Sequence, residues 1–133
     1  MSGAGPQRSD RARTGAQAEE LARRFLEANG LRLVERNFRC RNGELDLVML
    51  DGRELAIVEV RYRLTDRLVD PAVSVCPRKR RRIALAAAHY LQRRRQFAEL
   101  PVRFDVLAIT GGLDRPRYDW IRCAFTTDEV GGF

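Results

Sequence analysis

Two acidic residues lie in sequence that otherwise has the character of a β-hairpin. The stretch NGELDLVMLDGRELAIVEVRYR, residues 42–63, carries Asp46 in its first apolar run and Glu59 in its second. Acids in mid-strand are disfavoured by β-propensity and by the cost of burying charge. Mg²⁺ takes one or two protein carboxylates and keeps several waters, so a pair of this kind suits it. The pair therefore predicts a site for Mg²⁺, or for Mn²⁺ in its place.

The geometry of this pair depends on the turn between the strands. A two-residue turn at Asp51-Gly52 places Asp46 opposite Ile57. Asp46 then shares a face with Glu59 and lies diagonal to it, at about 7–8 Å between backbones. A three-residue turn would instead put the two acids on opposite faces of the sheet.

Nearby arginines offer a purely structural alternative. Arg61 and Arg63 follow Glu59 at even spacing, so these three side chains share one face of their strand. Asp46 and Glu59 could then simply form ion pairs with the two arginines. Spacing alone leaves the metal site and the ion pairs both open.

A third acid comes from a predicted helix. Glu19 lies near the apolar stripe of that helix, whereas its neighbour Glu20 falls on the solvent side. An acid at the edge of a packed face can reach over the sheet. The structural alternative is a favourable interaction with the helix dipole. Taken with Asp46 and Glu59, the site interpretation of Glu19 is the stronger one.

The elements that position these residues follow from periodicity and turn signals. Thr14 and Gln17 form a capping box that predicts a helix start, and Asn29-Gly30 ends that helix. The pair Asn42-Gly43 predicts a type I′ turn. Strands are predicted over 31–40, twice within 42–63, over 101–110 and, as a short last strand, within 117–125. A polar loop at 64–76 leads to a long helix over about 77–95.

The resulting order, αβββαβ(β), predicts an α/β fold in which helices flank a mixed β-sheet. Strands joined by tight turns are antiparallel, whereas a strand–helix–strand crossover makes the fourth strand parallel to its partner. We expect a single domain over residues 14–126, with a flexible basic tail at 1–13 and a C-terminal tail at 127–133.

The charge of the chain points to a polyanionic partner. The net charge is +7 and the isoelectric point is near 10.3. Nucleic acid is the simplest partner, and a solvated basic surface is the alternative. Basic charge at a helix start is unfavourable for the dipole, which favours a functional interpretation of the cluster there. Its members are Arg78, Lys79, Arg80, Arg81 and Arg82, and we assign them, with Arg63, to nucleic-acid binding.

Several function classes find no support. Three cysteines without a CxxC pair are typical of reduced thiols in a cytoplasmic protein. His89 is the only histidine, so His-metal and Ser-His-Asp sites are unsupported. The sequence has no apolar leader segment and no run long enough to span a membrane, so no membrane partner is expected.

The chain resembles the bacterial YraN-like family of uncharacterised proteins. The matching pieces are Gly15 with AEELARRFL, then NGELDLVMLDG, VEVRYR, SVCPRKRRR, VRFDVLAI and IRCAF, in order from residue 15 to 125. A helical Glu followed by a hairpin with Asp and Glu-x-Lys also resembles the restriction-endonuclease-like, or PD-(D/E)xK, nuclease core. That core is seen in archaeal Holliday-junction resolvases.

This resemblance implies roles for particular positions. Glu19 matches the helical acid, which could hold a second metal or an outer-shell water, and Asp46 and Glu59 match the metal-binding pair. Arg61 stands where the nuclease core usually has lysine. Arginine cannot take a proton from water, because its pKa stays above about 12, but it can clamp a phosphate through two hydrogen bonds. Lys79 is the only lysine of the chain and could supply what arginine lacks, a pKa that its surroundings can lower. A lone lysine in a basic cluster is the simpler interpretation.

Two functions follow. The first is a metal-dependent endonuclease acting on branched or structured nucleic acid, DNA rather than RNA, with Glu19, Asp46, Glu59 and Arg61 as its catalytic residues. The alternative is a non-catalytic nucleic-acid-binding protein on the same fold, inactive because of Arg61. A homodimer is suggested only because cutting two strands usually takes two sites. Asp105 shares a face with Arg103, which predicts an internal ion pair; a contribution to the acidic site is the other option.

Overall fold

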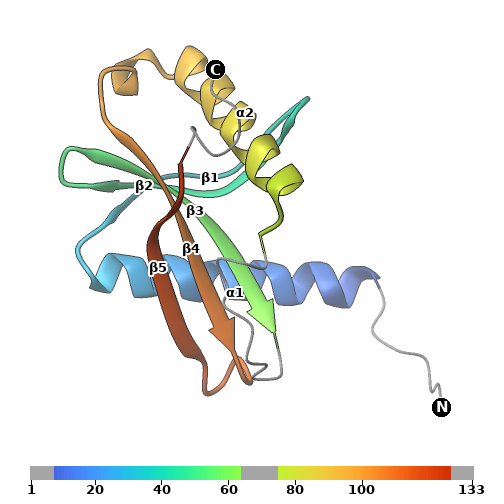
Figure 1. The fold of residues 1–133 in the computed structure, drawn as a ribbon. Helices are drawn as coiled ribbons and strands as arrows, with labels where there is room; N and C mark the ends of the chain where they lie inside the picture. Colours follow the sequence, from blue (N-terminus) through green and yellow to red (C-terminus); the bar gives the residue numbers. More distant parts are fainter. Residues whose placement is uncertain (1–7, 64–74, 127–133) are drawn as a thin grey trace.

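The computed structural model describes residues 8–63 and 75–126, which form a five-stranded sheet with one α-helix on each face (Figure 1). This confirms the predicted α/β class and element order, including the last strand. The elements are α1 (Arg8–Ala28), β1 (Arg32–Cys40), β2 (Gly43–Asp51), β3 (Glu54–Arg63), α2 (Pro77–Arg93), the short 3₁₀-helix η1 (Arg95–Phe97), β4 (Val102–Thr110) and β5 (Arg117–Phe125). The predicted loop at 64–76 falls largely outside the described residues, as do residues 1–7 of the predicted N-terminal tail and all of the predicted C-terminal tail at 127–133. No helix in the described ranges is long and apolar enough to cross a membrane.

The strands follow one another across the sheet in chain order, β1-β2-β3-β4-β5. All neighbours are antiparallel except β3 and β4, which pair in parallel from Leu55–Val102 to Arg63–Thr110. Helix α2 lies in the connection between these two strands, as the crossover rule predicts.

Helix α1 begins at Arg8, so the predicted start at Thr14 is wrong. The preceding residues RSDRAR contain neither Gly nor Pro, and nothing in their composition stops the helix from extending toward the N-terminus. The predicted stop is confirmed. Gly30 has φ +95°, and the Leu31 N–H donates to the carbonyl of Leu26 at 3.1 Å. This satisfies one of the orphan carbonyls at the helix end.

The β1–β2 turn differs from the type I′ turn predicted at Asn42-Gly43. Cys40 pairs with Gly43, so the turn residues are Arg41 and Asn42, and neither has positive φ. Gly43 serves close packing instead. A Cβ atom at this position would lie 3.2 Å from the backbone oxygen of Arg82 in α2. The hairpin can therefore approach the helix closely because residue 43 has no side chain.

The β2–β3 turn is also displaced from its predicted place. Asp51 pairs with Glu54, so the turn consists of Gly52 and Arg53 rather than Asp51 and Gly52. Gly52 has φ +62°, a conformation that glycine adopts without strain. The loop still contains two residues, but the register of the strands moves by two, which preserves the face on which each side chain lies.

Each face of the sheet has its own hydrophobic core. The core beneath α2 includes Val48, Ile57, Ile83, Tyr90, Phe104 and Phe125. The core beneath α1 includes Ala22, Leu26, Leu47, Met49, Val58 and Leu107. Because both faces of the central strands are covered, β3 is continuously buried over residues 55–59 and β4 over residues 103–109.

The middle of the β1–β2 hairpin is distorted. Leu45 and Leu47 have equal parity in β2, yet Leu45 packs beneath α2 and Leu47 beneath α1. On the neighbouring strand, Asn37 has φ +55°, between the pairs Arg36–Leu47 and Phe38–Leu45. The hairpin thus exchanges its two faces at this point. Asp46 is the residue of β2 at the exchange.

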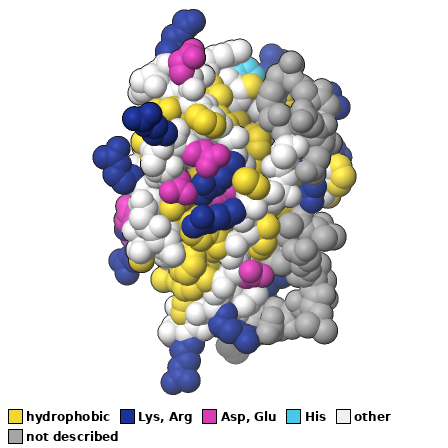
Figure 2. Space-filling view, turned by 60° about the vertical axis from the view of Figure 1, so that its left-hand side comes forward, with side chains coloured by type: hydrophobic (Ala, Val, Ile, Leu, Met, Phe, Trp, Pro, Cys, Tyr) yellow, Lys and Arg dark blue, Asp and Glu magenta, His cyan; other side chains and the backbone are white. Residues whose placement is uncertain are grey.

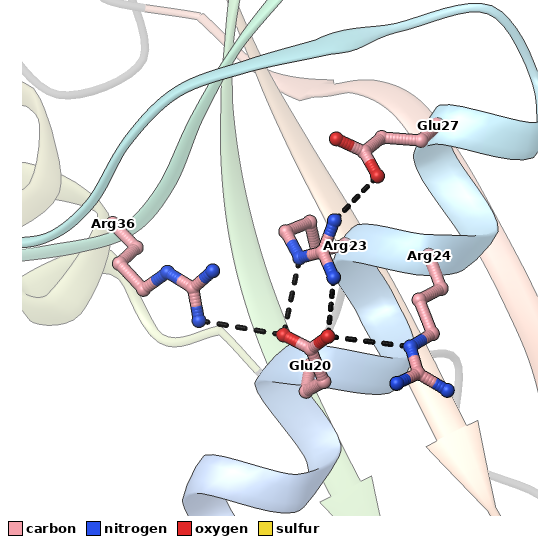
Figure 3. A network of polar contacts seen from close by, with 5 residues as sticks. All are labelled: Glu20, Arg23, Arg24, Glu27 and Arg36. Atoms are coloured by element: carbon pink, nitrogen blue, oxygen red, sulfur yellow. Dashed lines mark hydrogen bonds and ion pairs between the residues drawn. The ribbon is translucent and has the colours of Figure 1, made fainter.

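A network of ion pairs joins α1 to β1 (Figure 3). Glu20 accepts hydrogen bonds from Arg23 and Arg24 of its own helix, and from Arg36 of β1 at 3.4 Å. The hydrogen bond from Arg23 lowers the pKa of Glu20 to about 2. Arg23 also pairs with Glu27 at 2.5 Å. Glu20 therefore does not simply face solvent, as its sequence position suggested, but connects the helix to the edge strand.

Candidate active site

Asp46 lies where β2 and β3 separate. The last pair of the β2–β3 ladder toward this end is Leu47 with Val58. Beyond it, the backbone N–H of Val60 donates to Oδ2 of Asp46 at 2.9 Å. A carboxylate thus takes the place of a backbone carbonyl as the acceptor for β3.

The two strand acids converge. If the observed register is continued one residue beyond the pair Leu47–Val58, Asp46 lies opposite Glu59. The predicted pairing of Asp46 with Ile57 is therefore wrong. The two acids nevertheless line the same cleft, as the shared-face prediction requires. Their carboxyl groups are in hydrogen-bonding contact. The observed register brings them closer together than the diagonal arrangement predicted from the sequence.

Burial makes this pair electrostatically unusual. Desolvation, followed by the charge of Glu59, raises the pKa of Asp46 from 3.8 to about 8. The hydrogen bond from Val60 acts in the opposite direction but does not offset these effects. At neutral pH and without a cation, the Asp46 carboxyl group therefore keeps its proton in most molecules. This is the behaviour of like charges forced together in a poorly solvated place.

Glu59 is paired mainly with a residue of α2. Its side chain is 6% exposed, and its Oε2 lies 2.7 Å from Nζ of Lys79. Arg61 is more distant, with Nη1 at 4.0 Å from the same oxygen. Arg63 is exposed at the end of β3 and forms no ion pair with either acid in the described part of the chain. Of the ion pairs that the structural alternative predicted between these acids and Arg61 or Arg63, only the one between Glu59 and Arg61 is present among the described residues.

A cleft opens above the two acids. Its volume is about 670 Å³, and it lies between the start of α2 and the β1–β2 hairpin. Its walls combine three acids of the sheet, Glu44, Asp46 and Glu59, with a basic border. The lining residues are Arg39, Cys40, Gly43, Glu44, Asp46, Glu59, Cys76, Arg78, Lys79, Arg82 and Ile83.

Glu19 lies beside this cleft without lining it. Burial raises its pKa, and a hydrogen bond from the Asn37 side chain acts against that rise. The charges of Glu44 and Glu59 raise it further, so Glu19 is an electrostatic neighbour of the acidic pair. The left-handed Asn37 is thus the residue that holds Glu19 next to the distorted hairpin.

The basic cluster at the start of α2 divides into two groups. Arg78, Lys79 and Arg82 line the cleft. Arg81 is exposed outside it. Arg80 turns inward, where its Nε donates to the carbonyl of Val75 at 2.7 Å and its guanidinium lies 5.4 Å from the ring centre of Phe125. Three of the six residues predicted to bind nucleic acid therefore line the cleft with the acids, whereas Arg63, Arg80 and Arg81 do not.

Asp105 belongs to a separate buried network. It is fully buried, and Arg103 donates to it at 3.1 Å, which confirms the predicted ion pair. Nε1 of Trp120 and the backbone N–H of Cys123 also donate to it, each at 3.0 Å. It does not line the acidic cleft, since its strand neighbour Phe104 faces α2 and Asp105 faces the other way.

Some residues of the cleft carried no sequence signal. Arg39 and Glu44 pair with each other at 3.0 Å on its border, and Cys40 and Cys76 lie within it as free thiols. Their approach to the acids depends on how the hairpin packs against α2, which a local pattern does not encode. Figure 2 shows a face on which acidic and basic side chains gather together among hydrophobic ones.

The donor set fits a hard divalent cation. Two carboxylates are the number that Mg²⁺ or Mn²⁺ usually takes from a protein. A bound cation would replace the proton that burial keeps on Asp46. Within the described residues no group of three or more His, Cys, Asp or Glu is arranged to hold a metal, so Glu19 does not complete a third ligand position here.

Fold and cleft together define an α/β protein with paired acids at a strand separation and a basic border on the facing helix. Residues 18–109 match the model of the uncharacterised protein family UPF0102. The chain is 46% identical to a UPF0102 protein of Nitrosococcus oceani over 86% of its length and 93% of that protein. It is 50% identical to a UPF0102 protein of Xanthomonas oryzae pv. oryzae, over 90% and 96% of the two chains. The chain belongs to the UPF0102 family.

Proposed function

We propose that this protein is a metal-dependent endonuclease that hydrolyses phosphodiesters in branched or otherwise structured nucleic acid, DNA in the first instance. The observation that carries the proposal is the contact between Asp46 and Glu59 at the base of a cleft with a basic border. A protein that only binds phosphates gains nothing from two carboxylates placed there. The restriction-endonuclease-like nature of the core is part of the same proposal.

In this proposal the basic residues of the cleft bind phosphates and the acidic residues bind the metal ion. Arg39, Arg78 and Arg82 would bind backbone phosphates, which gives affinity without sequence readout. Asp46 and Glu59 would hold Mg²⁺ or Mn²⁺. A bound cation of this kind polarises a phosphodiester, lowers the pKa of water and offsets the charge that develops during hydrolysis.

Arg61 would act on the phosphate rather than on water. Its side chain is 26% exposed and extends from β3 beside Glu59. A guanidinium can donate two parallel hydrogen bonds to phosphate oxygens and so stabilise added negative charge. It does not release its proton at any ordinary pH, which excludes a role as the base. Glu19, held by its hydrogen bond to Asn37, would add negative charge near Asp46 and Glu59 and so affect their electrostatic environment.

The second candidate is a nucleic-acid-binding protein without catalytic activity. Two observations favour it: residue 61 is arginine, and Lys79 already neutralises Glu59. In that case the ion pair would be a permanent structural contact and the cleft would serve only to bind phosphates. The two candidates differ in whether Asp46 matters for anything beyond folding.

The test is cleavage by purified wild type and by two variants. Asp46→Asn removes one acid of the pair, and Asp119→Asn removes an exposed acid of β5 as a matched control. Labelled four-way, flap, duplex and single-stranded substrates are incubated in Mg²⁺, in Mn²⁺ and in EDTA. We expect cleavage by wild type and Asp119→Asn, and none by Asp46→Asn or in EDTA. Salt-dependent binding by all three proteins without cleavage would instead support the second candidate.

A further inference from the structure

Lys79 forms an ion pair with a carboxylate oxygen of Glu59 that the proposed cation would need as a ligand. Its ammonium lies 2.7 Å from Oε2 of Glu59, and that carboxylate is 6% exposed. The lysine side chain itself is 45% exposed. One partner is therefore fixed in the cleft wall, whereas the other keeps access to solvent.

The chemistry of the two cations is similar at this carboxylate. An ammonium group is a compact point charge, and so is a divalent metal ion, whereas a guanidinium is a planar fork. Oδ2 of Asp46 is already engaged by the backbone N–H of Val60. The polar atoms left for a cation between the strands are therefore few, and Lys79 takes one of them. Among 25 basic residues it is the only lysine.

We infer that Lys79 is a positioning residue that occupies the cation's place on Glu59 in the metal-free protein, and that it moves to a nucleic-acid phosphate when the cation binds. This inference rests on the proposed function, because it needs a divalent cation at Asp46 and Glu59.

The surroundings of Lys79 allow such a movement. It lies in the first turn of α2, and its neighbours in the cleft are Arg78 and Arg82. Both are placed to bind phosphates, so a released ammonium would stay where a nucleic acid is held. The released ammonium regains water, because the lysine side chain is 45% exposed. The metal supplies the greater charge to Glu59.

The test is Mn²⁺ binding to the full chain by titration calorimetry at pH 7.5, without nucleic acid. Lys79→Met removes the competing charge and keeps the length of the side chain. Lys79→Arg keeps the charge. Arg93→Met removes one charge from the exposed C-terminal end of the same helix, outside the cleft, and is the matched control. We expect Lys79→Met to bind Mn²⁺ about tenfold more tightly than wild type. Lys79→Arg and Arg93→Met should stay within about threefold of wild type.

A second measurement addresses the movement. Fluorescence anisotropy with a labelled four-way junction should give equal affinities for wild type and Lys79→Met in EDTA. In Mn²⁺ at 4 °C the variant should bind about tenfold more weakly, because only then does Lys79 contact a phosphate.

Two results would overturn the inference. Mn²⁺ binding by wild type with no gain in Lys79→Met, or equal junction affinities in Mn²⁺, would overturn it while leaving the proposed function in place. If neither wild type nor Lys79→Met binds Mn²⁺, the proposed function and the inference fall together.

Discussion

The backbone N–H of Val60 donates to Oδ2 of Asp46 across the point where β2 and β3 separate. One residue earlier, Leu47 and Val58 still form an ordinary ladder pair. The side chain of Asp46 therefore satisfies a donor that the separating strand leaves behind. This engages one of the two carboxylate oxygens of Asp46. The acidic site is thus a consequence of how the sheet opens.

The stability of the protein should fall as pH rises from about 4 to about 8. The pKa of Asp46 is raised from 3.8 to about 8 by burial and by Glu59, so the folded protein binds a proton that the unfolded chain has lost in this range. The free energy of unfolding then decreases with pH, by up to about 1.4 kcal/mol per unit for one proton. Urea denaturation at pH 5, 6, 7 and 8 in EDTA measures this slope.

The control for that slope is Asp46→Asn. Asparagine keeps an oxygen that can accept from Val60 but does not titrate, so its slope should be flatter and its stability at pH 8 higher than that of wild type. Asp119→Asn, on exposed β5, should follow wild type. A wild-type slope that is unchanged in Asp46→Asn would show that another group is responsible.

Divalent cations should reverse the loss of stability at high pH. A ligand that binds only the folded state stabilises it by about 2.7 kcal/mol at a concentration one hundred times its Kd. We therefore expect saturating Mn²⁺ at pH 8 to raise the Tm of wild type by about 5 °C or more. Asp46→Asn should show no such rise. An equal rise in both proteins would place the metal somewhere other than the paired acids.

Two glycine substitutions should have opposite effects. In Gly43→Ala the new Cβ would lie 3.2 Å from the backbone oxygen of Arg82, and a backbone atom cannot easily move aside. We expect a loss of about 1 kcal/mol or more. In Gly15→Ala the new Cβ meets nothing within 4 Å inside α1, and removal of a helix glycine should add about 0.5–1 kcal/mol. Urea denaturation of both variants checks the pair, and destabilisation by Gly15→Ala would contradict the extended helix.

Parity explains why the shared face of the acids could be predicted. The β2–β3 turn was predicted at Asp51-Gly52, one residue before its observed place. The observed strand register therefore differs from the predicted one by two residues. An even displacement changes the partners but not the faces, so Asp46 and Glu59 still meet. The element order survived for a similar reason, since periodicity and turn signals tolerate errors of one or two residues. The start of α1 was predicted wrongly, because residues in the pattern of a capping box can also occur within a helix.

The cleft itself had no local signal. Lys79 lies twenty residues further along the chain than Glu59 and contacts it from α2. Arg80, its neighbour, turns into the core against Phe125 instead. Which member of a basic run faces an acid is decided by the packing of α2 on the sheet. Sequence spacing identifies the run but not the division within it.

Arg103 should be among the most sensitive positions of the fold. Its side chain is 8% exposed and bonds to Asp51, Glu54 and the fully buried Asp105. Arg103→Met would leave the charge of Asp105 without its cation, at a cost of about 3–5 kcal/mol. Adding Asp105→Leu should recover part of this loss. Unfolding can be followed by the fluorescence of Trp120, the only tryptophan. If the double variant is less stable than Arg103→Met, the pair is not the source of the cost.

The basic border of the cleft should determine the salt dependence of nucleic-acid binding. Each phosphate contact that is lost lowers the slope of log K against log salt by about 0.9 on duplex DNA. Arg39→Gln and Arg82→Gln remove charges that line the cleft, so each should lower the slope by about that amount. Arg53→Gln changes an exposed arginine of the β2–β3 turn and should leave it unchanged. Anisotropy titrations between 50 and 200 mM NaCl in EDTA separate these cases. Equal slopes for all three variants would mean that the basic charge acts as a diffuse field, and that the border of the acidic cleft is not where the phosphates bind.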